Sequence, residues 1–249
     1  MEDLSSITAA ILAGGRGTRI QSVVPDRPKV LAPVYGRPFL SYLLDQLVEA
    51  GVQEVVLCTG YMAEQIRGTF SNKYRSLRLF YSREHVMLGT AGALRHASSF
   101  LKTENVLVMN GDSFVDTNLK DFCVWHCAHG ADATVMVVKV QDSGRYGQVQ
   151  VDGDGHLMGF CENGEEHRPA WINAGIYLLR HAFLDRITAG SPVSLERDVL
   201  PACIGHGLYA YRNHGSFLDI GTPEAYASAE SFFAGLAQKR LARLGQDGT

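Results

Sequence analysis

The chain has 249 residues, which is enough for one large domain or two small ones. Hydrophobic residues make up 46% and charged residues 20%, and this composition excludes disorder, collagen-like repeats and coiled coil as the main structure. The formal net charge of -3 gives no overall positive field for nucleic acid or for an anionic membrane. We therefore expect small-molecule partners, with no nucleic acid and no membrane.

Cysteine usage and the first residues bear on the compartment. The five cysteines are scattered and odd in number, a pattern typical of free thiols in a reducing environment. Two acids, Glu2 and Asp3, follow the first Met, without the pattern of a cleaved leader. No apolar run reaches the length that spans a membrane. These features predict a cytoplasmic protein.

The first half of the chain alternates short apolar runs with amphipathic stretches. Strands near ten-residue helices are typical of βαβ units, which build a parallel sheet with helices on both faces. The half is therefore predicted to be a Rossmann-like α/β structure. We expect strands at 8–13, 54–59, 77–81 and 105–109, and helices at 38–50, 63–70 and 91–100.

The second half is richer in strands, which we expect to cover one end of the sheet. Neither an internal repeat nor a linker is evident, so residues 1–249 are predicted to form one α/β domain. The expected order is helix 119–129, strand 133–140, a hairpin of 147–151 and 157–160, strand 171–179, short helix 194–200, strand material at 209–219, and a helix from 222 to about 244.

A glycine-rich loop, Gly14-Gly-Arg-Gly-Thr-Arg19, follows the first strand. Glycines let backbone amides approach a phosphate closely, and basic residues neutralise it. The loop is not a P-loop, and the third glycine of a dinucleotide fingerprint would fall on Ile20. The glycines alone also fit a tight turn without ligand, but Arg19 and Lys29 favour a phosphate-binding loop.

Asp112 and Asp219 are candidate ligands of a metal ion. Asp112 follows an apolar strand, at the carboxyl end where open α/β sheets bind ligands, and Asp219 lies 107 positions later. Carboxylates together with phosphate oxygens suit Mg²⁺. Each acid on its own also fits helix capping, and this alternative stays open.

Several motifs together resemble the sugar-1-phosphate nucleotidylyltransferase family. The similarity runs from about residue 8 to residue 235, and residues 23–40 most resemble D-glycero-D-manno-heptose 1-phosphate guanylyltransferases, with mannose-1-phosphate guanylyltransferases next. The motifs are the loop at 12–19, Pro28-Lys29, Leu88-Gly-Thr-Ala-Gly-Ala-Leu94, Asn110-Gly-Asp112, Asn173-Ala-Gly-Ile-Tyr177 and Asp219-Ile-Gly-Thr-Pro223.

The resemblance implies a nucleotide-binding half at 8–120 and a sugar-phosphate half at 121–235. It gives Arg19, Lys29 and Asp112 catalytic roles, and it gives Asp112 and Asp219 a Mg²⁺ ion. The implied nucleotide-binding residues are Leu12, Ala13, Gly14, Gly15, Gly17, Thr18, Glu84, Gly89, Thr90 and Gly111. The implied sugar-phosphate residues are Tyr146, Gly147, Glu162, Asn173 and Gly175.

The nucleotide base that the protein selects is predicted from Glu84, which lies five positions before Gly89. Uridylyl and thymidylyl relatives carry Gln at this position. A carboxylate only accepts hydrogen bonds, which suits the adjacent N1–H and N2–H₂ donors of guanine. The resemblance therefore implies GTP. The alternative is that Glu84 is a solvated loop acid.

The chain departs from many relatives at Asn163, where they carry a lysine that contacts the sugar phosphate. Arg145, His167 or Arg168 are candidates to replace that charge.

The resemblance implies transfer of GMP from GTP to D-glycero-α-D-manno-heptose 1-phosphate, giving a GDP-sugar and pyrophosphate for capsule or surface polysaccharide. The alternatives are mannose 1-phosphate as acceptor, or a non-catalytic regulatory homologue that binds a nucleotide sugar. The presence of Arg19, Lys29, Asp112 and Asp219 favours the enzyme. Phe232, Phe233 and Leu236 form an apolar face that either packs on the domain or joins a homodimer.

Overall fold

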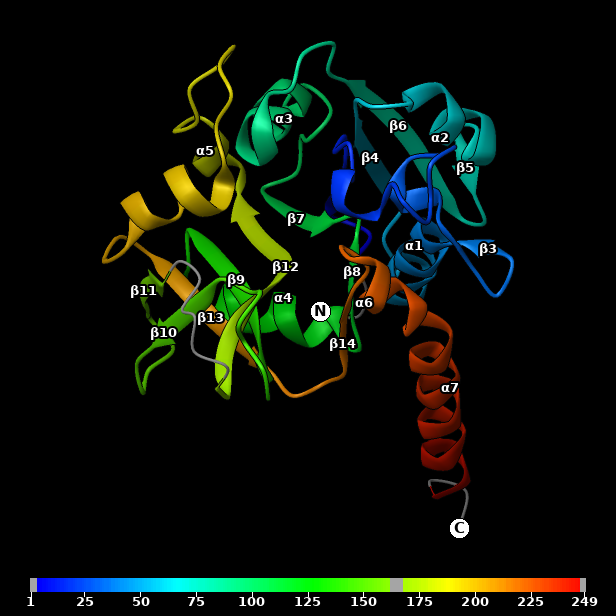
Figure 1. Ribbon diagram of the computed structural model, residues 1–249. Helices are drawn as coiled ribbons and strands as arrows, with labels where there is room; N and C mark the ends of the chain where they lie inside the picture. Colours follow the sequence, from blue (N-terminus) through cyan, green and yellow to red (C-terminus); the bar gives the residue numbers. More distant parts are fainter. Residues whose placement is uncertain (1–3, 162–167, 247–249) are drawn as a thin grey trace.

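The computed structural model describes residues 4–161 and 168–246, and Figure 1 shows a large twisted sheet between helices. Its helices are α1 (Phe39–Ala50), α2 (Ala63–Phe70), α3 (Gly89–Ala97), α4 (Leu119–Ala128), α5 (His181–Leu184), α6 (Pro223–Ala227) and α7 (Ala229–Gln246). Its strands are β1 (Thr8–Ala13), β2 (Pro33–Val34), β3 (Arg37–Pro38), β4 (Glu54–Thr59), β5 (Lys73–Tyr74), β6 (Leu77–Arg83), β7 (Asn105–Asn110), β8 (Ser113–Val115), β9 (Ala133–Val140), β10 (Gln148–Val151), β11 (Leu157–Cys161), β12 (Ala170–Arg180), β13 (Leu208–Asn213) and β14 (Phe217–Asp219).

The centre of the large sheet is parallel, in the order β7-β1-β4-β6. Because parallel strands end at the same edge, the segments that follow these four strands meet there. They begin at Gly111, Gly14, Gly60 and Glu84. The predicted α/β class is confirmed, and this edge carries the candidate site.

The added strands extend the sheet as predicted. β12 runs antiparallel to both β7 and β9, β10 and β11 form a hairpin beside it, and β13 runs parallel to β9. The pairing of β12 with β9 shifts register between Asn173 and Tyr177. Gly175 lies inside that irregularity with φ +75°, a conformation that favours glycine. Asn173 is the last residue of β12 paired with β9 before this irregularity.

Both faces of the sheet are buried, because successive residues of β1 belong to two different apolar cores. Ala9 and Ile11 pack in one core with side chains of α1, α4 and α7, whereas Ala10 packs in the other with side chains of α3 and α5. Full burial on both faces explains the continuous apolar runs of the parallel strands. Helices therefore cover both faces, as predicted.

Two elements expected as single pieces are divided. The strand material at 209–219 forms β13 in the large sheet and β14, which pairs with β8 in a separate small sheet. A turn at Gly215, where a Cβ would lie 1.7 Å from the Asp116 carbonyl oxygen, separates the two strands. The helix expected from 222 to about 244 is interrupted at Ser228, whose hydroxyl donates to the Ala225 carbonyl at 2.7 Å.

The small sheet decides where Asp219 lies. Asp219 is opposite Ser113, and the Ile220 amide donates to the Asp112 carbonyl at 3.0 Å. Two acids that are 107 positions apart in the sequence are therefore adjacent in the fold.

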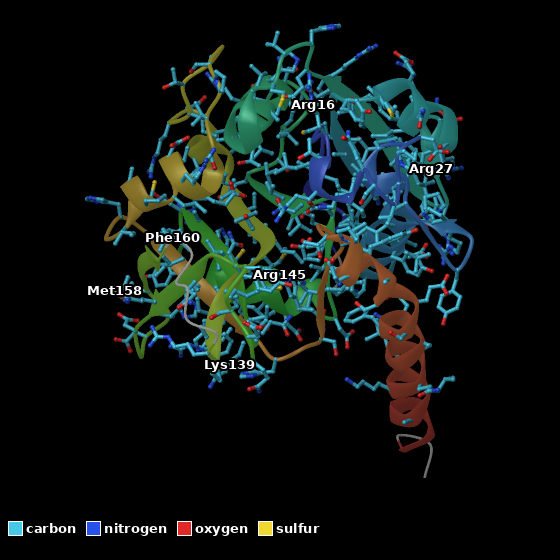
Figure 2. The ribbon with its side chains drawn as sticks, in the orientation of Figure 1. Arg16, Arg27, Lys139, Arg145, Met158 and Phe160 are labelled. Carbon is cyan, nitrogen blue, oxygen red and sulfur yellow. The ribbon has the colours of Figure 1, made fainter. Side chains whose placement is uncertain are left out.

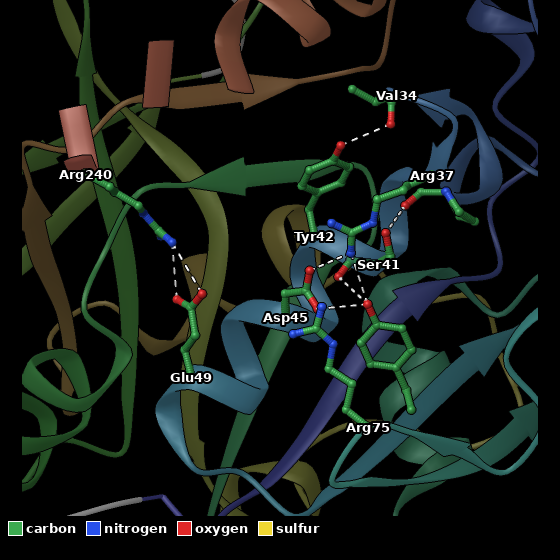
Figure 3. A network of polar contacts seen from close by, with 10 residues as sticks. Val34, Arg37, Ser41, Tyr42, Asp45, Glu49, Arg75 and Arg240 are labelled. Carbon is green, nitrogen blue, oxygen red and sulfur yellow. Dashed lines mark hydrogen bonds and ion pairs between the residues drawn. The ribbon is translucent and has the colours of Figure 1, made fainter. Parts of the chain in front are cut away.

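The apolar face of α7, formed by Phe232, Phe233 and Leu236, packs on the domain, and α7 contacts α1. Tyr42 stacks on Phe233 with ring centroids 3.9 Å apart, and Arg240 contacts the Glu49 carboxylate at 3.3 Å. Figure 3 shows Arg240 with Glu49, and beside them Asp45 of α1 held by Arg37 and Arg75. Phe233 and Leu236 are buried in the domain, and Phe232 packs partly buried against Phe114.

Within residues 4–161 and 168–246, no helix has the length and apolar character needed to cross a bilayer.

Candidate functional site

A cavity of about 390 Å³ opens at the carboxyl ends of the parallel strands. Most of the residues predicted to bind the nucleotide or to act in catalysis surround it. These are Leu12, Ala13, Gly14, Gly15, Gly17, Thr18, Arg19, Lys29, Glu84, Gly89, Thr90 and Asp112.

The glycine-rich loop follows β1 without room for side chains at several positions. Gly17 is left-handed with φ +60°, and a Cβ there would lie 3.0 Å from the Lys29 Cβ. Gly111 donates its amide to the Leu12 carbonyl at 2.9 Å, and a Cβ there would lie 2.7 Å from that oxygen. The backbone of Gly111 is therefore packed against the backbone of Leu12, and Gly17 is packed against the Lys29 side chain.

Lys29 lies between two carboxylates. Its ammonium donates to the Asp112 carboxylate at 2.6 Å and is 3.9 Å from Asp219. The Lys29 side chain is only 10% exposed. A buried ammonium needs paired charge, and two acids supply it here.

Asp219 is the acid of this cluster whose pKa is raised. Burial and the neighbouring Asp112 carboxylate raise its pKa, whereas Lys29 and a hydrogen bond from the Gly221 amide lower it. A cation bound to the two acids would remove the repulsion between them. Asp112 and Asp219 supply the carboxylate oxygens that Mg²⁺ prefers, so their donor set fits this ion.

Glu84 lies at the other side of the cavity, just after β6. Its carboxylate accepts from the Leu88 amide at 3.0 Å, and burial raises its pKa. A Cβ on Gly14 would be 2.7 Å from the carboxylate, and one on Gly60 would be 2.9 Å from it. Glu84 is therefore a half-buried group packed against the glycine-rich loop, and the alternative of a fully solvated loop acid does not fit this position.

Gly89 and Thr90 begin α3 and contact a distant segment. Gly89 has φ +73°, and a Cβ there would lie 2.4 Å from the Val193 carbonyl oxygen. The Thr90 hydroxyl donates to Glu196 at 2.7 Å. Residues 84–90, called the base loop below after their predicted contact with the base, are thereby attached to residues 193–196.

Among the residues predicted for the sugar phosphate, Asn173 and Gly175 lie on β12, and Tyr146 and Gly147 lie directly before β10. Gly147 accepts from the Asn173 amide at 3.4 Å, and Gly175 lies against Asn110 and Ser113. Tyr146 is half-buried, and the Asp219 charge contributes to raising its pKa after the larger effect of burial. Glu162 lies outside the described residues, as do Asn163 and His167.

Arg145, one of the three predicted replacement cations, lies beside Tyr146 and Thr222. Its guanidinium lies over the Tyr146 ring at 4.6 Å and donates to the Thr222 hydroxyl at 3.2 Å. Its charge also lowers the pKa of Asp219. Figure 2 shows Arg145 in the middle of the molecule, between the added strands and the start of α6.

Sequence reasoning missed six residues that line the cavity: Val30, Cys58, Met87, Ala93, Asn110 and Gly221. Asn110 and Gly221 stand next to predicted residues within their motifs, so the motifs themselves were the available signal. Cys58 lies one residue before the end of β4 and is buried, which raises its pKa to about 12. It is a neutral packing group, and nothing in the sequence distinguishes it from a core cysteine.

Taken together, the fold and the cavity define an α/β protein in which the glycine-rich loop, the buried Lys29 and Asp112 line one cavity, with Asp219 3.9 Å from the lysine. This arrangement can hold a polyphosphate beside a divalent cation.

Comparison with known proteins gives the family. Residues 8–235 match the model described as nucleotidyl transferase, so the chain belongs to that family. It is 34% identical over 223 residues to the D-glycero-alpha-D-manno-heptose 1-phosphate guanylyltransferase of Aneurinibacillus thermoaerophilus, covering 89% of this chain and 96% of that protein. It is 33% identical over 224 residues to the mannose-1-phosphate guanylyltransferase of Mycobacterium tuberculosis, covering 88% of this chain but 62% of that protein.

A solved structure agrees with the family assignment. HddC from Yersinia pseudotuberculosis, complexed with GMP-PN, matches with a TM-score of 0.80 and 32% identity, covering 91% of this chain and 99% of that one. The predicted family and fold class are therefore both confirmed.

The charge on Asp219 leads to a prediction about stability. In the metal-free protein, Asp219→Asn should be more stable than wild type at neutral pH, because the amide carries no buried charge beside Asp112 and its oxygen can still accept from Gly221. A carboxyl whose pKa is raised by folding makes the wild type lose stability as the pH rises through that range. The advantage of Asn should therefore shrink as the pH falls toward about 4.

Thermal unfolding with a chelator present, over a series of pH values, measures this difference. Asp121→Asn, which changes an exposed acid of α4, is the control and should show no such trend. A less stable Asp219→Asn protein at neutral pH would mean that the attraction to Lys29 outweighs burial.

Proposed function

We propose that the protein is a sugar-1-phosphate guanylyltransferase, which transfers GMP from GTP to a sugar 1-phosphate and releases pyrophosphate. The observation that carries the proposal is the convergence of Lys29, Asp112 and Asp219 beside the glycine-rich loop. The same convergence favours an enzyme over a regulatory homologue, since binding alone does not require a buried lysine between two acids.

The reaction is a displacement at the α-phosphorus of GTP. An oxygen of the sugar phosphate forms the new P–O bond, and the bond to the β-phosphate breaks, so that pyrophosphate leaves. The attacking phosphate is already anionic and needs no strong base, so the demands on the protein are positioning and charge stabilisation. Loop amides from Gly14 to Thr18 would hold the triphosphate, Arg19 the leaving pyrophosphate and Lys29 the α-phosphate.

We further propose that Asp112 and Asp219 hold Mg²⁺. When bound, the ion would neutralise phosphate charge and orient the phosphates. Lys29 contacts both acids, and it would keep their side chains directed toward the α-phosphate.

Guanine is the proposed base because of Glu84. The half-buried carboxylate accepts from the Leu88 amide and has further acceptor capacity for two donors on a base edge. Uracil and thymine would place a carbonyl against it, and adenine an unprotonated N1. The solved relative HddC is complexed with GMP-PN, which agrees with a guanine nucleotide.

For the acceptor we propose D-glycero-α-D-manno-heptose 1-phosphate, with mannose 1-phosphate as the second candidate. The heptose relative is matched over 96% of its length, and the mannose relative over 62%. Tyr146, Gly147, Glu162, Asn173 and Gly175 are the residues proposed to bind the sugar. We propose that the GDP-sugar made in the cytoplasm feeds capsule or surface polysaccharide. A homodimer stays a prediction.

The first prediction concerns the proposed metal. Asp112→Asn should reduce turnover by at least about a hundredfold while the protein stays folded, because a lost ligand removes several kcal/mol of transition-state stabilisation. Turnover against Mg²⁺ concentration is the measurement, and Asp121→Asn is the control. Near-normal rates for Asp112→Asn at low Mg²⁺ would refute the metal assignment.

The second prediction concerns the base, and it is also the test of the proposed function. Pyrophosphate release across GTP, ATP, UTP and dTTP, each with heptose, mannose and glucose 1-phosphates, should be highest with GTP and heptose 1-phosphate. Glu84→Gln should weaken GTP use and narrow the gap to UTP, since an amide can both donate and accept. A wild-type preference for UTP or dTTP would contradict the proposal.

The third prediction concerns the acceptor phosphate. Arg145→Ala should raise KM for the sugar 1-phosphate by about tenfold or more, because a charge-assisted hydrogen bond is lost, and Arg145→Lys should restore part of it. Lys139→Ala, which removes an exposed cation of β9 labelled in Figure 2, should change nothing. An unchanged KM for Arg145→Ala would place the acceptor phosphate elsewhere.

A further inference from the structure

The carboxylate of Glu196, which lies outside the cavity, joins the base loop to β12. Glu196 lies on the helical turn Leu195–Val199. One carboxylate oxygen accepts from the Thr90 hydroxyl at 2.7 Å and from the Ser194 hydroxyl at 3.0 Å, and the other accepts from the Tyr177 hydroxyl at 2.8 Å. Tyr177 in turn accepts from the Asn173 side-chain amide at 2.9 Å.

The direction of each bond in this network is fixed. The Thr90 hydroxyl already accepts from the Leu195 amide at 2.7 Å, and the Ser194 hydroxyl accepts from the Arg197 amide at 3.2 Å. A hydroxyl that accepts from an N–H has its own hydrogen left to donate. All three hydroxyl hydrogens therefore point at Glu196, which as a carboxylate can accept every one of them.

Because the Tyr177 hydroxyl donates to Glu196, it can accept a hydrogen bond from the Asn173 side chain. The Tyr177 side chain is fully buried, and burial followed by the Glu196 charge raises its pKa well above the usual range, so the hydroxyl keeps its hydrogen. The Asn173 side-chain oxygen accepts from the Gly175 amide at 2.9 Å. The amide of Asn173 thus has its nitrogen toward Tyr177 and its oxygen toward Gly175, and its second N–H is left for a ligand.

We propose that Glu196 is a positioning residue for the acceptor sugar, acting through Tyr177 to fix the orientation of the Asn173 amide. The inference rests on the proposed function, because it takes Asn173 as a sugar contact. It assigns a specific task to an acid that no motif of the family resemblance included.

The isosteric change Glu196→Gln isolates this task. The glutamine oxygen satisfies two donors, Thr90 and Ser194, if the amide nitrogen faces Tyr177. That N–H then opposes the Tyr177 hydroxyl hydrogen. When the hydroxyl turns toward Asn173 instead, the Asn173 amide flips and sets its nitrogen against the Gly175 N–H. The substitution therefore disturbs the Asn173 amide proposed to bind the sugar, whereas the hydrogen bond from Thr90 of the base loop is kept.

The kinetic test compares KM for the two substrates. Glu196→Gln and Tyr177→Phe should each raise KM for the sugar 1-phosphate about tenfold, the value of one well-made hydrogen bond, with KM for GTP changing much less. The double variant should be no worse than Tyr177→Phe alone, because both act through one chain of contacts. Asp198→Asn is the matched control on the same turn, where Asp198 accepts from the Ser194 amide, and it should leave both KM values unchanged.

Two results would overturn the proposal. An unchanged sugar KM in Glu196→Gln would remove the link to the sugar pocket. Equal rises in both KM values, with a lowered unfolding temperature, would make Glu196 a purely structural residue.

A readout without substrate separates this proposal from the proposed function. The NMR signals of the Asn173 side-chain amide, assigned by their loss in Asn173→Asp, should shift in Glu196→Gln and Tyr177→Phe but not in Asp198→Asn. If they shift while the wild type transfers nothing to any acceptor, the orienting role of Glu196 stands and the proposed function fails. If they stay in place, the orienting role is wrong, whatever the activity.

Discussion

The pairing of β8 with β14 is the constraint on which the rest of the site depends. It holds the Ile220 amide against the Asp112 carbonyl, and it puts Asp219 next to Asp112 with Lys29 between them. Without this short pairing, Lys29 would be buried with one acid, and Asp219 would have no reason to be desolvated. Burial first, and then the neighbouring Asp112 carboxylate, raises the pKa of Asp219. A small sheet of two strands thus sets the electrostatics of a cavity that the large sheet only outlines.

Much of the fold could be predicted, because local patterns carry it. Apolar runs such as 8–13 and 105–109 have to be strands buried on both faces, and the parallel order then places Gly14 and Asp112 at one edge. The division of 209–219 between two sheets could not be predicted, because it depends on a backbone contact between Gly215 and Asp116, far apart in sequence. The break at Ser228 coincides with a side-chain hydrogen bond to the Ala225 carbonyl, which the hydrophobic pattern of the sequence does not indicate.

The residues of the candidate site likewise fall into those that the sequence could predict and those that it could not. Motif residues such as Lys29 and Glu84 could be named because the family motifs locate them: Lys29 belongs to Pro28-Lys29, and Glu84 lies five positions before Gly89. Glu196 could not, because it follows no strand of the parallel core and reaches the site only through Thr90 and Tyr177. Side-chain networks that join distant elements leave no periodic signal in a sequence. They become visible only when donors and acceptors are assigned in space.

The attachment of α7 to α1 has a consequence for the order in which the molecule assembles. Tyr226 donates to the Pro33 carbonyl at 2.6 Å, Glu230 accepts from the Tyr35 amide at 3.1 Å, and Phe233 packs among Phe39 and Tyr42. These contacts bring residues near 35 together with residues near 230, and loops of such length close slowly. On a ribosome, the parallel core can form early, but the centre around Lys29 stays incomplete until Asp219 and the helices after it have been synthesised. Nascent chains would therefore carry a formed glycine-rich loop well before they carry a finished acidic pair.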